Sequence, residues 1–462
     1  MTEFFDTIAA VSTPRGKGGV ALIRISGREA FSVADAMFLP ANGIRLSDTP
    51  ASRAVYGNIV EDDGFAIDDG IATVFRAPHS FTGEDTVEIS CHGGALITQK
   101  VLELAFLCGA RPAGAGEFTR RAFINGKISL ERAEAIGGLL EAQTEAQLRI
   151  FSSGSASALS ERVESIRESI LALITELYAK IDYPEEDLSS IPRDELSSRI
   201  GAICSDCSRL LDTYRTGYAV TSGIRAVICG RANAGKSTLY NAFLGYEAAI
   251  VTEIEGTTRD VLEHTVSVGN VTLRLCDTAG LRSDTDDKVE QIGIGRTRNV
   301  IDLSELVIAV FDTSRPLDRE DIALAEELSK SDKTVIAVLS KADITREDFD
   351  VEFIRSRFEY TVTLHAKDGD IEPLKKLIES IFIDEDINIG KDAVLTDERQ
   401  SAALTVAVTS LKEAVRAADT GYGEDVCAMY AESALSALSE LSGKEISEQI
   451  VDGIFSKFCV GK

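Results

Sequence analysis

The chain has 462 residues, of which 48 are basic and 75 acidic, so its formal net charge is −27. This length allows about three domains with ample buried core. A non-specific nucleic-acid binder needs a basic face, so this acidity excludes that class and requires any RNA contact to be local or shared with a partner. The eight scattered cysteines favour reduced thiols in a cytoplasmic protein. The N-terminus is acidic where a signal peptide is basic, so we expect that the protein is not exported. No apolar run approaches about 18 residues, so we expect no membrane-spanning helix.

In chain order, strand-like runs between turn glycines come first, at 20–25 and 87–90, and they predict a mixed α/β domain. From about 129 to 182 apolar residues recur in alternating steps of three and four, which predicts helix packing. This stripe is Val163, Ile166, Ile170, Leu173 and Leu177.

Helix-like sequence flanks a central α/β module on both sides, at about 192–217 and again after the acidic linker 384–386. This arrangement predicts one helical domain into which the module is inserted. The predicted domains are an N-terminal α/β domain (1–120), the first part of a helical domain (121–217), a P-loop domain (218–383) and the second helical part (384–462).

The central module opens with a complete phosphate-binding loop, from Gly230 to Ser237. It follows an apolar run at 226–229 and precedes a helix-like stretch at 238–244, which is the context this motif requires. Its glycines let backbone N–H groups and a helix N-terminus face an anion, while Lys236 reaches the β- and γ-phosphates and the Ser237 hydroxyl binds Mg²⁺. The predicted nucleotide contacts here are Asn233, Ala234, Gly235, Lys236, Ser237 and Thr238, with Lys236 also catalytic.

Two switch-like segments follow in the order that a GTPase requires. The stretch 256–260 would bring the Thr258 hydroxyl to Mg²⁺. A predicted strand at 273–276 is then followed by the motif Asp-x-x-Gly. The Asp277 carboxylate would hold the metal through water, and the Gly280 N–H would sense the γ-phosphate. The order and spacing of these segments predict a Ras-like GTPase.

A guanine-reading loop follows the predicted strand 335–339. The Asp343 carboxylate can accept two hydrogen bonds from guanine, one from N1–H and one from the exocyclic amine, and adenine cannot donate this pair. Lys341 belongs to the same loop, between Ser340 and Asp343. The loop opens with Ser340 where Asn is usual. We therefore expect weaker guanine affinity, with the choice of base kept by Asp343.

Motifs outside the GTPase signature point to one family. They are Asp6–Ala10, Gly16–Gly27, Ser80–Asp85, Cys91–Gly94, Gly116–Phe123 and the terminal Phe458–Lys462. Together with the GTPase motifs, these segments resemble the tRNA modification GTPase MnmE (TrmE) family over the whole length of the chain.

The resemblance implies a specific reaction. Members work as homodimers with FAD-containing MnmG, in a heterotetramer, to add an aminomethyl or carboxymethylaminomethyl group to C5 of the tRNA wobble uridine U34. The one-carbon unit comes from 5,10-methylene- or 5-formyltetrahydrofolate held by the N-terminal domain. Matched by motif, the folate residues are Arg24, Glu88, Lys127 and Lys462. A carboxylate suits the amide-like edge of a pterin, although Arg24 and Glu88 could simply be paired strand residues.

The resemblance also supplies what Ras-like catalysis lacks here. Leu281 stands where Gln would orient the attacking water, and the family instead uses a bound K⁺ and pairing of its GTPase domains. By motif, the K⁺ ligands are Asn233, Thr252, Ile254 and Thr257, and Glu290 is the catalytic, water-orienting glutamate. A loop-stabilising hydrogen bond is the alternative role for Asn233.

Two other functions fit the GTPase motifs. One is a ribosome-assembly or RNA-associated regulatory GTPase, although such proteins usually carry a basic RNA-binding module and this chain has no basic terminal domain. The other is a folate-dependent transferase that acts without a flavoprotein.

Overall fold

The computed structural model describes residues 6–14, 16–182, 191–246, 263–276, 300–365, 370–445 and 447–461. These form two compact units, one of residues 1–137 with 436–462 and one of residues 138–435. The boundaries between the units fall within two helices, α4 (Leu130–Glu141) and α15 (Glu424–Leu441).

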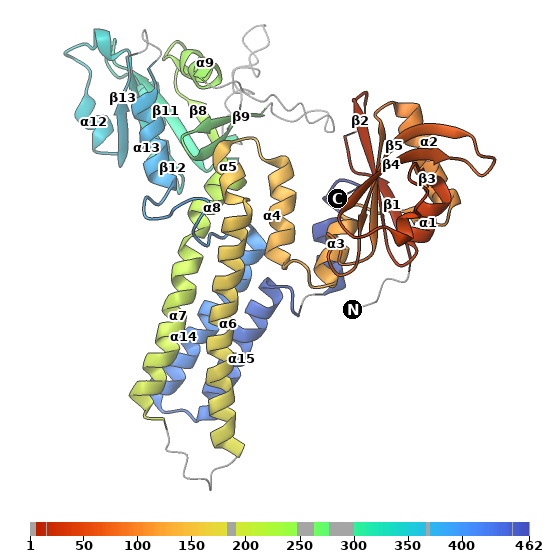
Figure 1. The fold of residues 1–462 in the computed structure, drawn as a ribbon. Helices are drawn as coiled ribbons and strands as arrows, with labels where there is room; N and C mark the ends of the chain where they lie inside the picture. The colour runs from red at the N-terminus through yellow and green to blue at the C-terminus, as the bar shows by residue number, and fades with distance from the viewer. Residues whose placement is uncertain are drawn as a thin grey trace. The chain divides into compact units, whose positions relative to one another are not determined.

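The first unit is built on a sheet with the strand order β3-β4-β5-β6-β2-β1-β7 (Figure 1). Its strands are β1 (Ile8–Val11), β2 (Val20–Ser26), β3 (Phe38–Pro40), β4 (Arg53–Val60), β5 (Ala66–Phe75), β6 (Thr86–His92) and β7 (Arg111–Pro112). Its helices are α1 (Ala30–Met37), the 3₁₀ turn η1 (Leu46–Asp48), α2 (Ala95–Leu107), α3 (Glu117–Ile124) and, from the C-terminal segment, α16 (Glu448–Phe455).

The two faces of this sheet differ in polarity because successive side chains of a strand point to opposite faces. Ile23 and Ile25 of β2 and Ile89 of β6 are fully buried in the core with α1 and α2. The intervening residues Arg24 and Glu88 therefore point to the other face, directly opposite each other across the β2–β6 pair.

The P-loop domain has a sheet of order β13-β12-β11-β8-β10-β9, in which β9 and β10 are antiparallel and the other neighbours are parallel. Its elements are β8 (Ile224–Cys229), α9 (Lys236–Tyr246), β9 (Glu263–Val268), β10 (Val271–Cys276), β11 (Leu306–Asp312), α11 (Arg319–Leu328), β12 (Thr334–Ser340), η3 (Ala342–Ile344), α12 (Val351–Arg355), β13 (Tyr360–Thr363) and α13 (Glu372–Phe382). Core clusters lie on both faces, one with α9 and α13 and the other with α11 and α12, as the continuous apolar strands require.

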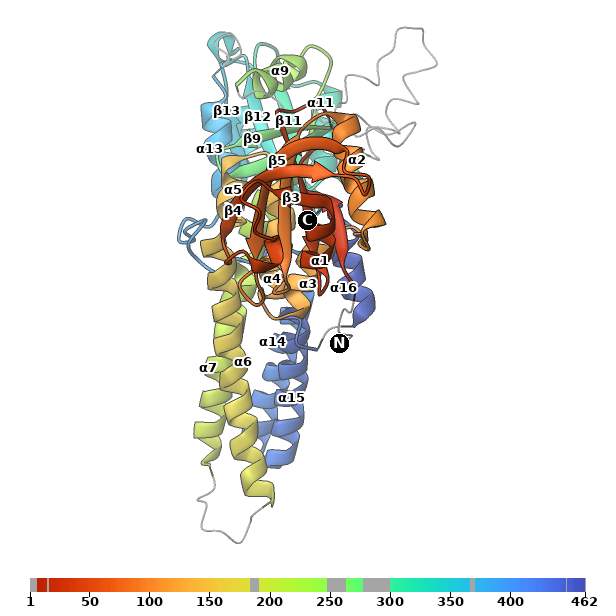
Figure 2. The ribbon, with the colours of Figure 1, turned by 45° about the vertical axis from the view of Figure 1, so that its right-hand side comes forward.

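The second unit, which contains the P-loop domain, also has long helices that run side by side (Figures 1 and 2). They are α6 (Ser153–Asp182), α7 (Arg193–Asp212), α14 (Glu398–Thr420) and α15, with the shorter α5 (Glu145–Ile150) and α8 (Tyr214–Thr221) near the P-loop domain. The predicted stripe on α6 is confirmed, since all five residues are buried. Because α7 precedes the P-loop domain and α14 follows it, their contact at Cys204 and Val408 confirms the predicted insertion.

One buried amide joins the helical part to the strands that lead to the phosphate loop. The Gln147 Oε1 atom accepts from the backbone N–H groups of Gln143 (2.7 Å) and Thr144 (3.2 Å). Its Nε2 atom donates to the Thr221 carbonyl (3.1 Å) and to the Thr272 hydroxyl (3.4 Å), just before β8 and within β10. The amide is thus fully satisfied where the two parts meet.

Among the described helices, none combines the length and the apolar composition that a membrane crossing requires.

Candidate functional site

The phosphate loop lies at the carboxyl end of β8, where the chain order reverses between β10 on one side and β11 on the other. Ligands of open α/β sheets bind at such switch points. Gly230 (φ 136°) must be glycine, because a Cβ atom there would lie 2.4 Å from the Val310 carbonyl oxygen. Gly235 (φ 102°) and Asn233 (φ 63°) also have positive φ, which Asn tolerates better than most residues. This conformation gives Asn233 a backbone role in addition to any ligand role.

The groups predicted to meet phosphate and Mg²⁺ lie at the start of α9. Ser237 and Thr238 are exposed in its first turn, where the helix dipole favours an anion. The Lys236 Nζ atom donates to the Arg231 carbonyl at 2.5 Å, so the ammonium lies over the loop itself. Arg231 in turn forms ion pairs with Asp318 and Glu320 beside α11, which hold the outer side of the loop.

Ser340 joins the phosphate loop to the end of β12. Ser340 is 5% exposed. Its Oγ atom lies 2.7 Å from the Ala234 carbonyl oxygen and 3.1 Å from the Phe311 carbonyl oxygen. The Ser340 carbonyl accepts from both the N–H (3.1 Å) and the hydroxyl (3.0 Å) of Thr313. Three loops of the candidate nucleotide site are therefore held through one small residue.

The next residues hold the backbone that leads to Asp343, the predicted guanine-reading residue. Lys341 has a left-handed backbone (φ 57°), and its Nζ atom lies 2.7 Å from the Asp312 carboxylate. Burial alone would raise the pKa of Asp312, but hydrogen bonds from Lys341 and Ser314 outweigh it, so the pKa is lowered. Asp343 follows in η3 with an exposed side chain. Asp312 thus fixes Lys341, two residues before the exposed Asp343.

The predicted folate residues lie around one loop of the first unit. Arg24 and Glu88 form a half-buried ion pair at 2.7 Å, with side-chain exposures of 16% and 21%. The Arg24 guanidinium lies 5.5 Å from the centres of the Phe81 and Phe118 rings. Lys127, which is exposed, donates to the Pro78 carbonyl at 2.8 Å. Arg24 and Lys127 therefore both contact the segment 78–81, Arg24 through Phe81.

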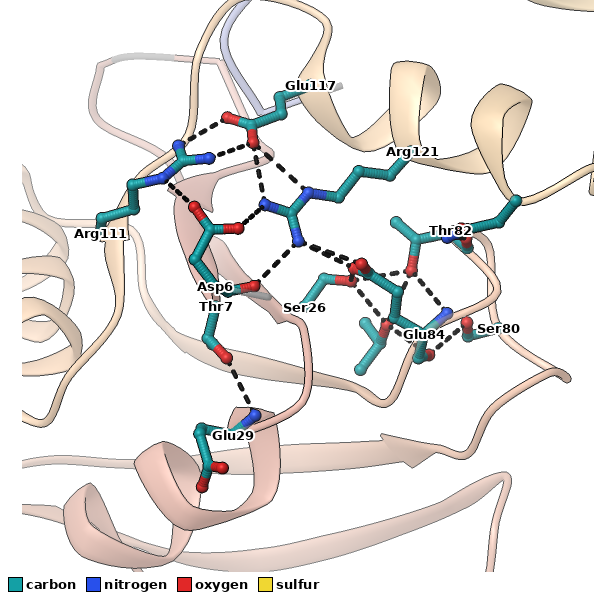
Figure 3. A network of polar contacts seen from close by, with 12 residues as sticks. Asp6, Thr7, Ser26, Glu29, Ser80, Thr82, Glu84, Arg111, Glu117 and Arg121 are labelled. Atoms are coloured by element: carbon teal, nitrogen blue, oxygen red, sulfur yellow. Dashed lines mark hydrogen bonds and ion pairs between the residues drawn. The ribbon is translucent and has the colours of Figure 1, made fainter. Parts of the chain in front are cut away.

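A buried charge network braces this segment (Figure 3). Arg121 of α3 is fully buried and binds three carboxylates, those of Asp6 (2.7 Å), Glu117 (3.0 Å) and Glu84 (3.1 Å). It also donates to the Asp6 carbonyl at 3.0 Å. Because a buried charge is tolerated only when it is paired and hydrogen-bonded, these partners are required together.

A second arginine completes the network. Arg111 donates to Asp6 at 2.5 Å and to both oxygens of Glu117 at 2.6 and 2.9 Å. Burial alone would raise the pKa of Asp6 and of Glu117, but hydrogen bonds from Arg111 and Arg121 outweigh it and lower both pKa values. Both carboxylates are therefore ionised at neutral pH.

Hydroxyl groups carry the network into the loop beside Arg24. Ser26 donates to Glu84 at 2.8 Å and shares a hydrogen bond with Thr82 at 2.8 Å, while Ser80 donates to the Glu84 carbonyl. Asn125 donates to the Thr82 carbonyl at 2.8 Å. The loop that bears Phe81 is thus fixed on both sides.

The C-terminal tail lies against β1 of the same unit. Val460 forms an antiparallel bridge with Ala115, and the Gly461 carbonyl accepts from the Ser12 hydroxyl at 3.0 Å. A Cβ atom on Gly461 (φ 98°) would lie 2.1 Å from the Val11 carbonyl oxygen, so this close approach requires glycine. Since Ala10 pairs with Arg24, the tail lies next to the strand that borders the candidate folate site. Cys459 is exposed.

Known proteins match both parts of the chain, the N-terminal domain and the helical domain that carries the phosphate loop. Residues 7–127 match the family described as "GTP-binding protein TrmE N-terminus", and residues 130–459 match "MnmE helical domain". The chain is 37% identical to the tRNA modification GTPase MnmE of Lactobacillus helveticus, over 100% of this chain and 99% of that protein. The chain belongs to the MnmE family of tRNA modification GTPases. As a member of the MnmE family it is a GTP hydrolase of tRNA modification.

Another relative also matches over nearly its whole length. The MnmE protein of Carboxydothermus hydrogenoformans is 36% identical over 99% of both chains. Among solved structures, Era of Aquifex aeolicus bound to GDP and AlF₄⁻ matches 41% of this chain and 66% of its own, at 20% identity and a TM-score of 0.26. The MnmE assignment thus comes from the full-length relatives.

Several predicted site residues of the MnmE-like chain lie outside the described residues. They are Thr252, Ile254, Thr257, Thr258, Asp277, Gly280, Glu290 and Lys462. Their roles stay predictions.

The sequence motifs did not indicate the residues that support the site. Asp312 ends an apolar strand, and the predicted metal ligand Asp277 has a similar place in the sequence, directly after an apolar run; this position was the available signal for Asp312. Phe118 and Arg121 lie within a family motif whose internal roles the sequence could not assign. The hydroxyl contact of Ser340 depends on the approach of two loops and has no local signal.

We predict that Arg121→Met destabilises the protein by about 3–5 kcal/mol at neutral pH, because it leaves the buried Glu117 and the partly buried Glu84 and Asp6 without their shared cation. Asp6 and Glu117 have lowered pKa values, so their contribution is present above about pH 4 and is lost as the pH falls through their folded-state values. The deficit of the variant should therefore shrink on acidification. Urea unfolding of the full-length protein from about pH 7 to about pH 3 measures it.

The matched control is Arg53→Met, which removes an exposed arginine of β4 and should have little effect. A deficit of Arg121→Met that stayed constant across this pH range would contradict the ionised network.

Proposed function

We propose that this chain is a K⁺-activated GTPase that acts in the cytoplasm as a homodimer with an FAD-containing MnmG partner, in a heterotetramer. With this partner it adds an aminomethyl or carboxymethylaminomethyl group to C5 of U34 in tRNA. The carbon comes from 5,10-methylene- or 5-formyltetrahydrofolate. The observation that carries the proposal is the 37% identity to an MnmE protein over the whole chain.

The phosphate loop supports the nucleotide part of this proposal. Backbone N–H groups of residues 233–238 and the α9 dipole attract the phosphates. In the nucleotide-bound form the phosphates replace the Arg231 carbonyl as the acceptor of Lys236. Mg²⁺, held by the Ser237 and Thr258 hydroxyls, would supply charge neutralisation between the β- and γ-phosphates.

Hydrolysis further requires that a water molecule be oriented and that charge on the leaving phosphate be balanced. Leu281 has no polar group for the first task, and we assign it to Glu290. For the second we assign K⁺, with ligands from Asn233, Thr252, Ile254 and Thr257. Asn233 is exposed on the phosphate loop, so its side chain is accessible to such an ion.

The residues around Arg24 fit a reduced folate. The Glu88 carboxylate keeps 21% of its side chain exposed and can accept from a pterin N–H edge. Phe81, which is itself 38% exposed, offers an aromatic wall. Exposed Lys127, with Lys462 of the tail, offers positive charge for the glutamate moiety. These groups would bind and orient the folate, which would supply the one-carbon unit.

We predict that a strain lacking this gene product regains the modified wobble uridine when it expresses the wild-type chain but not Lys236→Ala. Loss of the Lys236 ammonium removes the main side-chain contact to the β- and γ-phosphates. Nucleoside mass spectrometry of total tRNA measures the outcome. Lys330→Ala, at an exposed lysine of the same domain, is the control and should restore the modification.

Restoration by Lys236→Ala would separate GTP hydrolysis from the modification. An unchanged nucleoside profile in the deletion strain would instead favour a ribosome-assembly GTPase.

We predict that GTP hydrolysis and GTPase-domain pairing are faster in KCl than in NaCl. Asn233→Gly should reduce the K⁺ stimulation by on the order of tenfold or more while GTP still binds, because it removes the side-chain ligand. Gly is preferable to Ala here, since it accepts the positive φ of this position. Glu290→Ala should keep the K⁺-dependent pairing and lose turnover.

Asn241→Ala, at an exposed asparagine of α9, is the matched control for Asn233→Gly. Equal rates of the wild-type protein in the two salts would rule out the cation mechanism and leave the GTPase in place.

We predict that the full-length protein binds 5-formyltetrahydrofolate with equal affinity in the absence and presence of GDP. Glu88→Gln should weaken binding by roughly tenfold or more, because a hydrogen bond to a charged group is lost while the size of the side chain is kept. Isothermal titration calorimetry measures both affinities.

Glu103→Gln, at an exposed glutamate of α2, is the control. If the affinity of Glu88→Gln equals that of the wild type, the pterin lies elsewhere.

A further inference from the structure

The hydroxyl group of Ser340 already has its acceptors inside the protein. Its Oγ atom lies 2.7 Å from the Ala234 carbonyl oxygen and 3.1 Å from the Phe311 carbonyl oxygen. A hydroxyl has a single proton to donate, so either bond uses it completely. The residue is also only 5% exposed.

The surrounding backbone keeps Ser340 in this position. Gly235 of the phosphate loop passes over it, so that a Cβ atom on Gly235 would lie 3.8 Å from the Ser340 Cβ and Oγ atoms. On the other side, the N–H and hydroxyl groups of Thr313 both donate to the Ser340 carbonyl. Ser340 is thus enclosed between two loops, and its proton is directed at backbone.

Guanine presents two different edges to a protein. The Watson–Crick edge offers the N1–H and amino donors, which a carboxylate such as that of Asp343 can accept. The other edge offers the acceptors N7 and O6, which only a donor can read. An Asn at position 340 would have two amide protons, one for the Ala234 carbonyl and one for the base. Ser340 has only the first.

We infer that Ser340 braces the phosphate loop and does not read the base, so this chain selects guanine by its Watson–Crick edge through Asp343 and is indifferent to N7. This inference rests on the proposed nucleotide site. It gives the chain a base specificity that differs from that of a GTPase with Asn at this position.

The test compares GDP with 7-deaza-GDP, in which a C–H group replaces N7, on the full-length protein with Mg²⁺. The wild-type protein should bind the two nucleotides with dissociation constants within about twofold of each other. Ser340→Asn should bind GDP roughly five-fold more tightly than 7-deaza-GDP, the effect of one added hydrogen bond. Wild-type binding of 7-deaza-GDP roughly five-fold or more weaker than that of GDP would overturn the inference.

Ser340→Ala makes the test independent of whether Asn fits this enclosed position. It should weaken GDP and 7-deaza-GDP by the same factor, because it removes only the brace to Ala234. Weakening of GDP alone would show that the hydroxyl reads N7, and the inference would fail. Ser331→Ala removes a hydroxyl that also donates to a backbone carbonyl, that of Leu328, and should leave both affinities unchanged.

Asp343→Asn tests the proposed nucleotide site separately. An amide at this position donates to the C2 carbonyl of xanthine and accepts from its N1–H, so the preference should move from GDP to xanthosine diphosphate. If Asp343→Asn does not change the preference in this way, the proposed nucleotide site itself is wrong, whatever the result with 7-deaza-GDP.

Discussion

The N-terminal unit depends on one buried guanidinium group. Arg121 is fully buried, and a charge in that position is stable only with its partners in place. Those partners come from three segments that are distant in sequence: Asp6 before β1, Glu84 in the loop before β6, and Glu117 in the same helix. Glu84 in turn holds Ser80 and Ser26 (Figure 3), and the loop that these contacts fix carries Phe81, whose ring the Arg24 guanidinium contacts.

This constraint explains why the family motifs occur where they do. The segments that include Asp6, Glu84 and Arg121 are separate signatures in the sequence but one network in space. Removal of any one of the three carboxylates takes a hydrogen-bond acceptor away from the fully buried Arg121. Such a network rigidifies when all its members are satisfied, which favours a single arrangement of the loop that carries Phe81.

The P-loop domain solves a similar problem with neutral groups. The ends of β8, β11 and β12 must stay in register although the loops after β8 and β12 contain residues with positive φ. Ser340 provides this connection with hydrogen bonds to the backbone, and the Lys341–Asp312 pair fixes the next residue. The backbone that leads to Asp343 is thus held by contacts within the protein.

Much of the fold could be predicted from the sequence because its signals are local. Apolar runs predicted β8 and β12, the period of α6 predicted its buried stripe, and the flanking helices predicted the insertion. The domain limits at 120, 217 and 383 stay predictions, as does the role of each site residue. The pairing of Arg24 with Glu88 was foreseen only as an alternative to folate binding, and the structure shows the pair without excluding the ligand.

The supporting contacts could not be predicted, because each joins residues far apart in the chain. Arg121 and Asp6 are separated by 115 positions, and Ser340 and Ala234 by 106. Hydrogen-bond geometry at such separations depends on the complete fold. The departure at Ser340 was visible in the sequence as the loss of an amide, whereas its contact with the phosphate loop was not.

The composition of the first unit has a consequence for how the chain is made. Residues 436–462 belong to the same unit as residues 1–137, and Gly461 lies against β1. A ribosome synthesises residues 138–435 before it synthesises the tail, in which Val460 pairs with Ala115 and Gly461 accepts a hydrogen bond from Ser12. The first unit must therefore remain unfinished while residues 138–435 are synthesised, and the docking of α16 and the tail is one of the last events of its folding.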